Sequence, residues 1–186
     1  MPTPTNPSLR YRDWKSPVFG EHCPAQIEWA MMAAYIDGEG SIVMPPRRGQ
    51  GRTTVTVSLL LHVANTDIRL PQWCQRIFGG SYCVANKSEV YRGRNVKDCY
   101  HWSTTATRAA WIIYNCLPFF VIKRDQAELA IALQESITKR NTEKQRPRLL
   151  PEEVVQERLE LKRKLSQIKK RGRIDWSQRT ISKEVN

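Results

Sequence analysis

Met32-Ala-Ala-Tyr-Ile-Asp-Gly-Glu-Gly40 closes an apolar run that opens at Pro24. Large side chains such as Trp29 recur among alanines in this run, and that spacing predicts a helix through Ile36. We expect residues 37–40 to end the helix, because glycine tolerates the left-handed turn that follows many helices. The two acids of this turn would then stand at the negative end of the helix dipole.

Asp37 and Glu39 favour a bound cation at this position, because the dipole makes two uncompensated carboxylates costly there. Carboxylate oxygens suit Mg²⁺, a hard ion that takes one or two carboxylates and completes its shell with water and phosphate. The alternative is structural: Asp37 would hydrogen-bond to nearby amides, as in common Asx turns, and Glu39 would be solvated.

Two segments rich in β-branched residues follow the turn and predict an antiparallel hairpin over 41–44 and 53–63. The prolines at 45 and 46, in the turn-like segment 45–52, limit how far the first strand can extend. Alternation in the second strand predicts a buried face with Val55, Val57, Leu59 and Leu61, and an open face with Thr54, Thr56, Ser58 and Leu60.

The same order of elements then repeats. Asn65-Thr-Asp predicts a cap for a helix over 68–78, which ends at Gly79-Gly80. Strands are expected over 81–85 and 99–104, followed by helices over 105–116 and 118–135. The order α-β-β-α-β-β-α gives an α/β fold of the α+β type, in which helices cover one face of an antiparallel sheet and leave the other free.

The charge of the chain points to a polyanionic partner. Among 186 residues, 30 Lys and Arg outnumber 18 Asp and Glu, a surplus that a small-molecule enzyme does not need but a nucleic-acid-binding protein does. No apolar run reaches the roughly 20 residues that span a bilayer, and no secretory signal opens the chain. Five cysteines without a C-x-x-C pair indicate reduced thiols in an intracellular protein that is not secreted.

We expect three parts in the chain: an unassigned extension over 1–22, a core over 23–138 and, where the basic charge is concentrated, a C-terminal extension over 139–186. The last segment holds 15 Lys and Arg against 7 Asp and Glu. A helix is expected there from Pro151 to just before Gly172. Its apolar stripe is imperfect, so a solvated charged helix and an arm that follows DNA both fit the pattern.

The segment Met32–Gly40 resembles the signature of the LAGLIDADG homing endonucleases, in its closing acid-glycine pattern above all. The hairpin, the Gly79-Gly80-Ser81 strand entry and the block Leu117-Pro-Phe-Phe-Val-Ile-Lys-Arg-Asp-Gln-Ala-Glu-Leu129 follow in that family's order. The resemblance covers about residues 25 to 135. It implies a curved antiparallel sheet that binds DNA.

The resemblance also implies roles at the turn. Glu39, with the carbonyl of Gly38, would hold Mg²⁺, with Mn²⁺ or Ca²⁺ able to substitute in binding. Lys123 would be the basic residue near the cleaved phosphate, with Arg124 as its rival. Asn65 would order water and Arg69 would add a basic group, although Asn65 fits a helix cap equally well.

Family members with one signature act as homodimers, and this sequence has one. Two copies of the first helix would pack across a two-fold axis and bring two Glu39 carboxylates together. Small side chains allow such a close approach, although alanine is also simply a good helix former. The expected interface carries Ala30, Ala33, Ala34 and Asp37.

DNA recognition would belong to the free sheet face, because alternate side chains of a curved sheet can meet base edges in a major groove. Basic members of this set would touch phosphate. The candidates are Arg47, Arg48, Arg52, Thr54, Thr56 and Ser58 from the first hairpin, and Tyr82, Asn86, Arg92, Arg94, Lys97 and His101 from the second.

These features predict a homodimeric, metal-dependent, site-specific endonuclease that cuts one phosphodiester per strand of a long, roughly palindromic duplex. Intron or intein homing would be its setting, in the compartment that holds the host DNA, without a membrane or a small-molecule cofactor. The alternative is an RNA maturase for group I intron splicing, or a relative that binds DNA without cutting it. Together, Glu39 and Lys123 favour the enzyme, because a pure binder has no use for an acid that repels phosphate.

Overall fold

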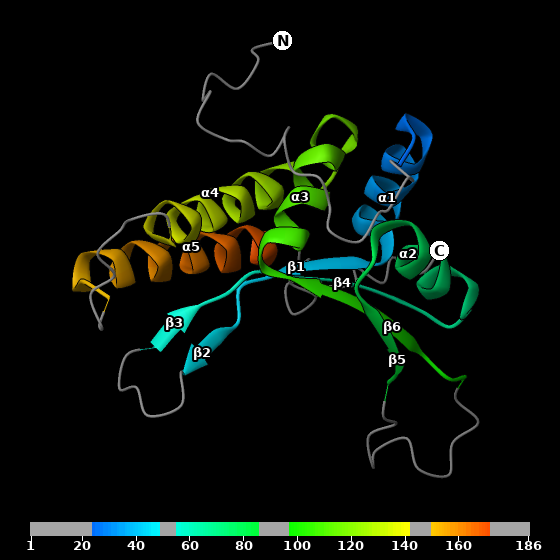
Figure 1. The fold of residues 1–186 in the computed structure, drawn as a ribbon, viewed down its shortest axis with the longest axis horizontal. Coiled ribbons are helices and arrows are strands. Elements are labelled where there is room, and N and C mark those ends of the chain that lie inside the picture. Colours follow the sequence, from blue (N-terminus) through cyan, green and yellow to red (C-terminus); the bar gives the residue numbers. More distant parts are fainter. Residues whose placement is uncertain (1–23, 49–54, 86–96, 142–149, 172–186) are drawn as a thin grey trace, which may run out of the picture.

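The structure is a computed structural model, and it describes residues 24–48, 55–85, 97–141 and 150–171. It is a mixed fold of helices and antiparallel strands (Figure 1). The helices are α1 (Gln26–Glu39), α2 (Arg69–Phe78), α3 (Ala106–Cys116), the 3₁₀ helix η2 (Leu117–Phe119), α4 (Arg124–Asn141) and α5 (Glu152–Arg171). The strands are β1 (Gly40–Val43), β2 (Pro46–Arg48), β3 (Val55–Val57), β4 (Leu60–Asn65), β5 (Ser81–Val84) and β6 (Tyr100–Thr105).

The main sheet has the order β1-β4-β6-β5, with every neighbouring pair antiparallel. Helices α1, α2 and α3 lie on one side of it, and the described elements leave its other side uncovered (Figure 1). The predicted order α-β-β-α-β-β-α and the predicted two-layer arrangement are therefore confirmed.

The core forms between the sheet and the helices. Residues of β4 alternate as expected, so that Leu61 and Val63 are fully buried while His62 is half-buried. Trp29 of α1 packs against Phe78 of α2, with ring centroids 5.1 Å apart. An edge-on contact at 4.8 Å joins the same ring to Trp111 of α3. One aromatic cluster therefore holds the three helices together.

The second strand of the first hairpin is interrupted, contrary to the prediction of one strand over 53–63. Its described part splits into β3 and β4 at Ser58 and Leu59, and β3 pairs with β2 in a separate two-stranded sheet. The break lies opposite residues 44 and 45, because Val43 pairs with Leu60 and Pro46 with Val57, and proline has no N–H to donate to a strand partner. Ser58 instead donates its N–H to the carbonyl of Pro45, and Leu59 accepts a bond from Ala106 N–H.

The helix predicted over 118–135 begins later and extends further in the structure. Residues 117–119 form η2, and α4 begins only at Arg124. The amides of residues 121–123 bind a side chain of α1, as described below, so they do not enter a helix.

The predicted stop at Gly79-Gly80 is confirmed, and here glycine is required. Both residues have positive φ angles, of 69° and 85°. A Cβ atom at Gly80 would lie 2.6 Å from the carbonyl oxygen of Ser103. The buried indole of Trp102 donates to the Gly79 carbonyl at 2.8 Å, which fixes the end of α2 against β6.

Helix α5 packs on α4 rather than standing free in solvent (Figure 1). Leu165 is buried in the main core, and the buried guanidinium of Arg158 donates to the carbonyl and hydroxyl oxygens of Ser136 on α4. Among the described helices, none is both long enough and apolar enough to cross a bilayer.

Candidate functional site

Helix α1 extends one turn further than predicted and includes both acids of the turn. It ends at Glu39, and Gly40 begins β1 with an extended backbone, φ −93° and ψ 168°. Gly40 is therefore not in the left-handed conformation that we expected. Its constraint is close packing, because a Cβ atom there would lie 2.6 Å from the Cα atom of Ile36.

The carboxylate of Asp37 binds the segment that leads into α4. It accepts hydrogen bonds from the backbone N–H groups of Val121 and Ile122, at 2.8 and 3.1 Å, and of Lys123, at 2.9 Å. These amides precede the N-terminus of α4, where a negative charge is favourable. Asp37 therefore caps α4 within its own chain. This matches the alternative in which Asp37 hydrogen-bonds to backbone amides instead of binding a cation.

Lys123 completes the reciprocal contact at the end of α1. Its ammonium donates to the carbonyl oxygens of Ile36, Asp37 and Gly40, at 2.6, 2.7 and 2.9 Å. The carbonyl of Ile36 also accepts from the N–H of Gly40, so Lys123 adds a second donor there and joins the end of α1 to the beginning of β1. Burial lowers the pKa of Lys123, and the nearby carboxylates of Asp37 and Glu39 raise it in part.

Glu39 differs from Asp37 in being exposed. Its carboxylate makes no hydrogen bond or ion pair within the described residues, and its charge acts on Lys123. The described residues contain no cluster of three or more metal-ligating side chains. One chain therefore supplies one available carboxylate here, together with the C-terminal carbonyls of α1, such as that of Gly38, which is the set of hard oxygen donors that Mg²⁺ accepts.

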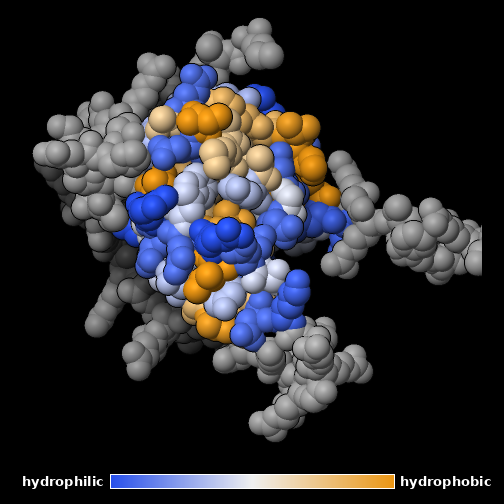
Figure 2. Space-filling view, turned by 90° about the vertical axis from the view of Figure 1, so that its right-hand side faces the viewer, coloured by the Kyte–Doolittle hydropathy of each residue, from blue (hydrophilic) through white to orange (hydrophobic). Residues whose placement is uncertain are grey.

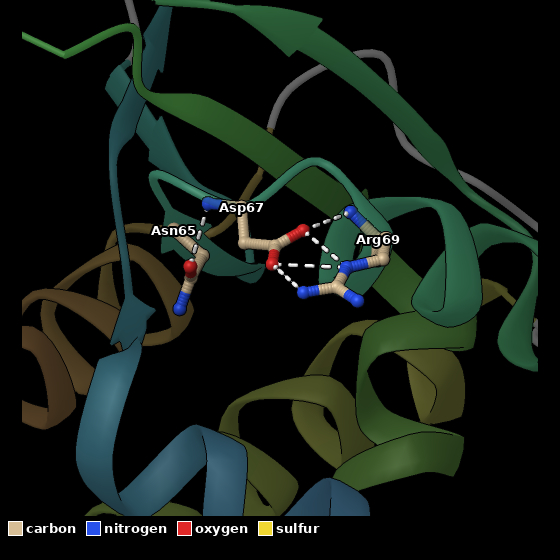
Figure 3. Close-up of polar contacts among 3 residues, drawn as sticks. All are labelled: Asn65, Asp67 and Arg69. Atoms are coloured by element: carbon tan, nitrogen blue, oxygen red, sulfur yellow. Dashed lines mark hydrogen bonds and ion pairs between the residues drawn. The ribbon is translucent and has the colours of Figure 1, made fainter.

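Asn65 and Arg69 lie at the same end of the sheet, because Gly40 of β1 pairs with Val63 of β4. The side-chain oxygen of Asn65 accepts from the N–H of Asp67 at 2.8 Å, which forms an Asx turn ahead of α2 (Figure 3). Asn65 does not cap α2 as predicted, because the helix begins at Arg69 and its N-cap residue is Ile68, which makes no side-chain cap bond. Its side-chain nitrogen makes no hydrogen bond in the described part of the chain.

Asp67, which the sequence did not single out by itself, binds Arg69. Its carboxylate accepts from the backbone N–H of Arg69 at 2.9 Å and from the guanidinium, with two contacts of 3.0 Å to Nε (Figure 3). These hydrogen bonds lower the pKa of Asp67 to about 2 and raise the pKa of Arg69. Arg69 is therefore exposed but paired.

The open face of the main sheet carries a polar row that runs across its strands. Ser41, His62, Ser103 and Ser81 are neighbours in the strand register, and His101 follows one row further. The rings of His62 and His101 lie 6.2 Å apart. His62 was missed, although continuing the alternation of the second strand by two residues beyond Leu60 would have found it.

Of the predicted recognition residues, the structure confirms the open-face position of His101 and corrects that of Tyr82. Tyr82 pairs with Trp102, so its ring turns toward the core side, where its hydroxyl accepts from Gln72 at 3.4 Å. Thr56 and Ser58 are half-buried, and Lys97 is exposed just before β6. The structure gives only the backbone of Arg47 and Arg48 in β2, while Arg52, Thr54, Asn86, Arg92 and Arg94 lie outside the described residues.

Helix α1 is apolar on the face that it turns away from the core. Ile27 is 66% exposed and Met31 39%, and the exposed Ala34 and Gly38 follow at helical spacing. Figure 2 views the side of the molecule where α1 and α2 lie, and apolar residues gather toward its top. A Cβ atom at Gly38 would meet nothing within 4 Å, so no packing within the described chain explains this glycine.

This outer face corrects part of the predicted interface. Ala33 is fully buried in the chain's own core and cannot contact a second copy. Asp37 uses its carboxylate within its own chain. Ala30, which is half-buried, and Ala34 remain on the surface.

Comparisons with known proteins place the fold. No family model matches the sequence, and no curated protein is significantly similar to it. Among solved structures, the chain resembles the homing endonuclease I-CvuI, in complex with its target in the presence of calcium. The TM-score is 0.57 and the identity 20%, over 84% of this chain and 87% of that one. A second structure of I-CvuI was obtained with a DNA target in the presence of magnesium.

Two further structures give the same result. The archaeal intron-encoded homing endonuclease I-Vdi141I, complexed with DNA, matches at a TM-score of 0.62 and 10% identity, over 81% of this chain and 89% of that one. The LAGLIDADG homing endonuclease I-GzeII, in complex with its DNA target, matches at 0.52 and 15% identity. That match covers 72% of this chain but only 43% of I-GzeII. The chain has the fold of the LAGLIDADG homing endonucleases.

Proposed function

We propose that this chain, whose fold is that of the LAGLIDADG homing endonucleases, is a member of that family and a site-specific DNA endonuclease. One observation carries the proposal. The exposed Glu39 carboxylate stands beside the ammonium of Lys123, at the end of an antiparallel sheet whose polar face is open. An acid next to a lysine serves phosphodiester hydrolysis, which needs both a place for a divalent cation and compensation for charge on the phosphate.

Glu39 and the Gly38 carbonyl would hold Mg²⁺, because both are hard oxygen donors at the negative end of α1. Such an ion would stabilise the negative charge that builds on the phosphate during hydrolysis. Asp37 cannot replace Glu39 in this role while it caps α4. Magnesium and calcium were present in the I-CvuI structures, which agrees with a divalent cation here.

The other predicted site residues have compatible positions. Lys123 is held by three carbonyl oxygens, so its charge would be fixed close to a phosphate bound at Glu39. The uncommitted side-chain nitrogen of Asn65 would orient a water molecule. Arg69 would meet phosphate by exchanging its contact with Asp67 for one with the DNA backbone.

The chain would act as a homodimer through the outer face of α1. Ile27 and Met31 expose apolar area there, and Ala34 and Gly38 allow a second helix to approach closely. Because Gly38 adjoins Glu39, a two-fold axis through this face would place two Glu39 carboxylates near each other. Each would serve one strand of a long, roughly palindromic duplex, and intron or intein homing would be the biological setting.

The duplex would lie on the open face of the main sheet. Ser41, His62, Ser103 and His101 would face the groove, because they share one side of antiparallel strands. The formal net charge of +12 would draw the chain to the phosphate backbone.

The proposal is tested by selecting cleaved duplexes from a randomised library with purified protein and Mg²⁺. We expect a discrete target that is cut with Mg²⁺ and left intact with chelator. Glu39→Gln should slow cleavage by at least about 100-fold while duplex binding persists, because removing one group that stabilises a transition state costs that much. Glu28→Gln is the matched control, since Glu28 lies at the other end of α1, where its carboxylate binds the N–H of Ala25.

Cleavage that survives Glu39→Gln would contradict the assignment of Glu39. A protein that binds duplex but never cuts it would be the inactive relative, and tight binding to a group I intron without DNA cleavage would indicate a maturase.

A further inference from the structure

Lys169 in the last turn of α5 reaches the main sheet. Its ammonium donates to the hydroxyl of Ser41 on β1 at 3.2 Å, a contact between residues 128 positions apart in the sequence. Ser41 directly follows Gly40, whose carbonyl holds Lys123. The C-terminal helix therefore delivers a basic side chain to the edge of the candidate site.

The ammonium of Lys169 is only partly satisfied. It has three donors, but Ser41 is its one hydrogen-bond partner within the described residues, and no carboxylate there forms an ion pair with it. The residue is half-buried, and no acid in the described part of the chain offsets the cost of removing its charge from water. Burial and the charge of Lys123 both lower the pKa of Lys169.

The surroundings of Lys169 are positive on two sides. Lys123 lies toward the end of α1, and His62 lies beside Ser41 in the strand register. Burial lowers the pKa of His62, and the charges of His101 and Lys169 lower it further. Like charges are destabilising unless an anion joins them. Among the described residues, the carboxylates of Asp37 and Glu39 act on Lys123, and none acts on Lys169 in the same way.

We propose that Lys169 binds a backbone phosphate of the duplex at the same site, with Ser41 orienting its ammonium and Lys123 as the neighbouring cation. A phosphate fits because it offers several acceptor oxygens and a full negative charge to donors that have no other partner among the described residues. This inference rests on the proposed function, and it makes α5 part of the DNA-binding surface.

The test is the salt dependence of binding to a fluorescently labelled oligonucleotide duplex of fixed sequence. It is measured in EDTA, where no cleavage interferes and KCl alone sets the ionic strength. Each phosphate contact contributes about 0.9 to the slope of log K against log salt. Lys169→Gln removes one contact from each protomer of the proposed homodimer, so it should flatten the slope by about 1.8. Lys169→Arg keeps the charge and should keep the slope.

The matched control is Lys164→Gln. Lys164 is exposed on the same helix and makes no hydrogen bond within the described residues, so this variant removes an equal charge away from the site. We expect its slope to equal that of the unsubstituted protein. Thermal unfolding of each variant verifies that it is folded.

The outcomes separate the two proposals. A Lys169→Gln slope equal to that of the unsubstituted protein, or an equal flattening by Lys164→Gln, would overturn the phosphate contact and leave the proposed nuclease function standing. An unsubstituted protein that binds no duplex would overturn the proposed function itself.

Discussion

Gly38 and Gly40 lie two residues apart at the end of α1, but only Gly40 is packed too closely to accept a side chain. A Cβ atom at Gly40 would meet the backbone of Ile36, which cannot move without disrupting the helix, whereas one at Gly38 would meet nothing. We expect Gly40→Ala to lower the free energy of unfolding by about 1–3 kcal/mol, as overpacking does. Gly38→Ala, the matched control, should raise it by up to about 1 kcal/mol, because alanine is the better helix former.

Urea unfolding of the two variants, followed by circular dichroism, measures this difference at a protein concentration where the chain is monomeric. Equal stabilities would contradict the close packing of Gly40 on Ile36. The sequence predicted the glycines of this turn correctly as a helix end, but for the wrong reason. Steric contact with a residue four positions earlier depends on where β1 turns, which the motif alone does not specify.

Asp67 provides a pH-dependent prediction. Its pKa lies at about 2, below the ordinary 3.8, because the side chain of Arg69 binds its charged form. A carboxyl with a lowered pKa stabilises the folded state above pH 3.8, and this contribution is lost as the pH falls toward 2. Arg69→Gln should return the pKa of Asp67 toward 3.8, as measured by carbon-13 NMR titration of the side-chain carboxyl. An unchanged midpoint would show that the pair does not form in solution.

At the scale of elements, Asp37 and Lys123 join the end of α1 to the beginning of α4. Removing the carboxylate with Asp37→Ala leaves the amides of residues 121–123 without their acceptor. We expect a loss of about 1–2 kcal/mol in the free energy of unfolding, the upper range for a helix cap. Hydrogen exchange at the amides of Val121 and Ile122 should quicken in parallel.

The control for this prediction is Asp125→Ala. Asp125 is exposed in the first turn of α4, so its removal changes the same charge without breaking those bonds. If both variants lost equal stability, helix-dipole electrostatics rather than specific capping would explain the effect.

The elements that the sequence predicted best are those with strong local signals. Apolar spacing and Gly79-Gly80 defined α2 within one residue, and β-branched alternation gave the buried faces of β4. The errors arose where distant residues decide the backbone. Asp37 binds the amides of residues 121–123, which therefore stay outside α4. The Pro45 carbonyl accepts the N–H of Ser58, at the break between β3 and β4. Neither contact can be predicted from the spacing of apolar residues along the sequence.

For the whole molecule, the outer face of α1 predicts self-association. Because Met31 is exposed and lies between Ile27 and Ala34 on this face, Met31→Glu should place a charge in the interface and yield a monomer. Sedimentation velocity would show the unsubstituted protein as a dimer of 21.6 kDa chains and the variant as a single chain. Gln75→Glu, on the exposed side of α2, should leave the dimer intact. A monomeric unsubstituted protein would contradict the proposed assembly.

Much of the candidate site could be predicted from the sequence because its residues adjoin recognisable segments: the acidic turn, the strand end and the Val-Ile-Lys-Arg block. The position of Lys169 could not be predicted. It depends on how α5 docks on α4 through the buried Leu165 and Arg158, and a charged helix with an imperfect stripe does not reveal its direction. The alternative of a solvated helix is wrong, because Val155 and Leu165 of α5 are buried, whereas the alternative of an arm that follows DNA stays a prediction.

The bonds between Asp37 and residues 121–123 span 84 to 86 positions of the chain. During synthesis the amino-terminal end emerges from the ribosome first. Asp37 can therefore form these bonds only after about two thirds of the polypeptide has been synthesised. A prematurely terminated product would carry the acids without Lys123. If the proposed nuclease function is right, truncated copies should therefore not cleave DNA, even when they retain the whole signature.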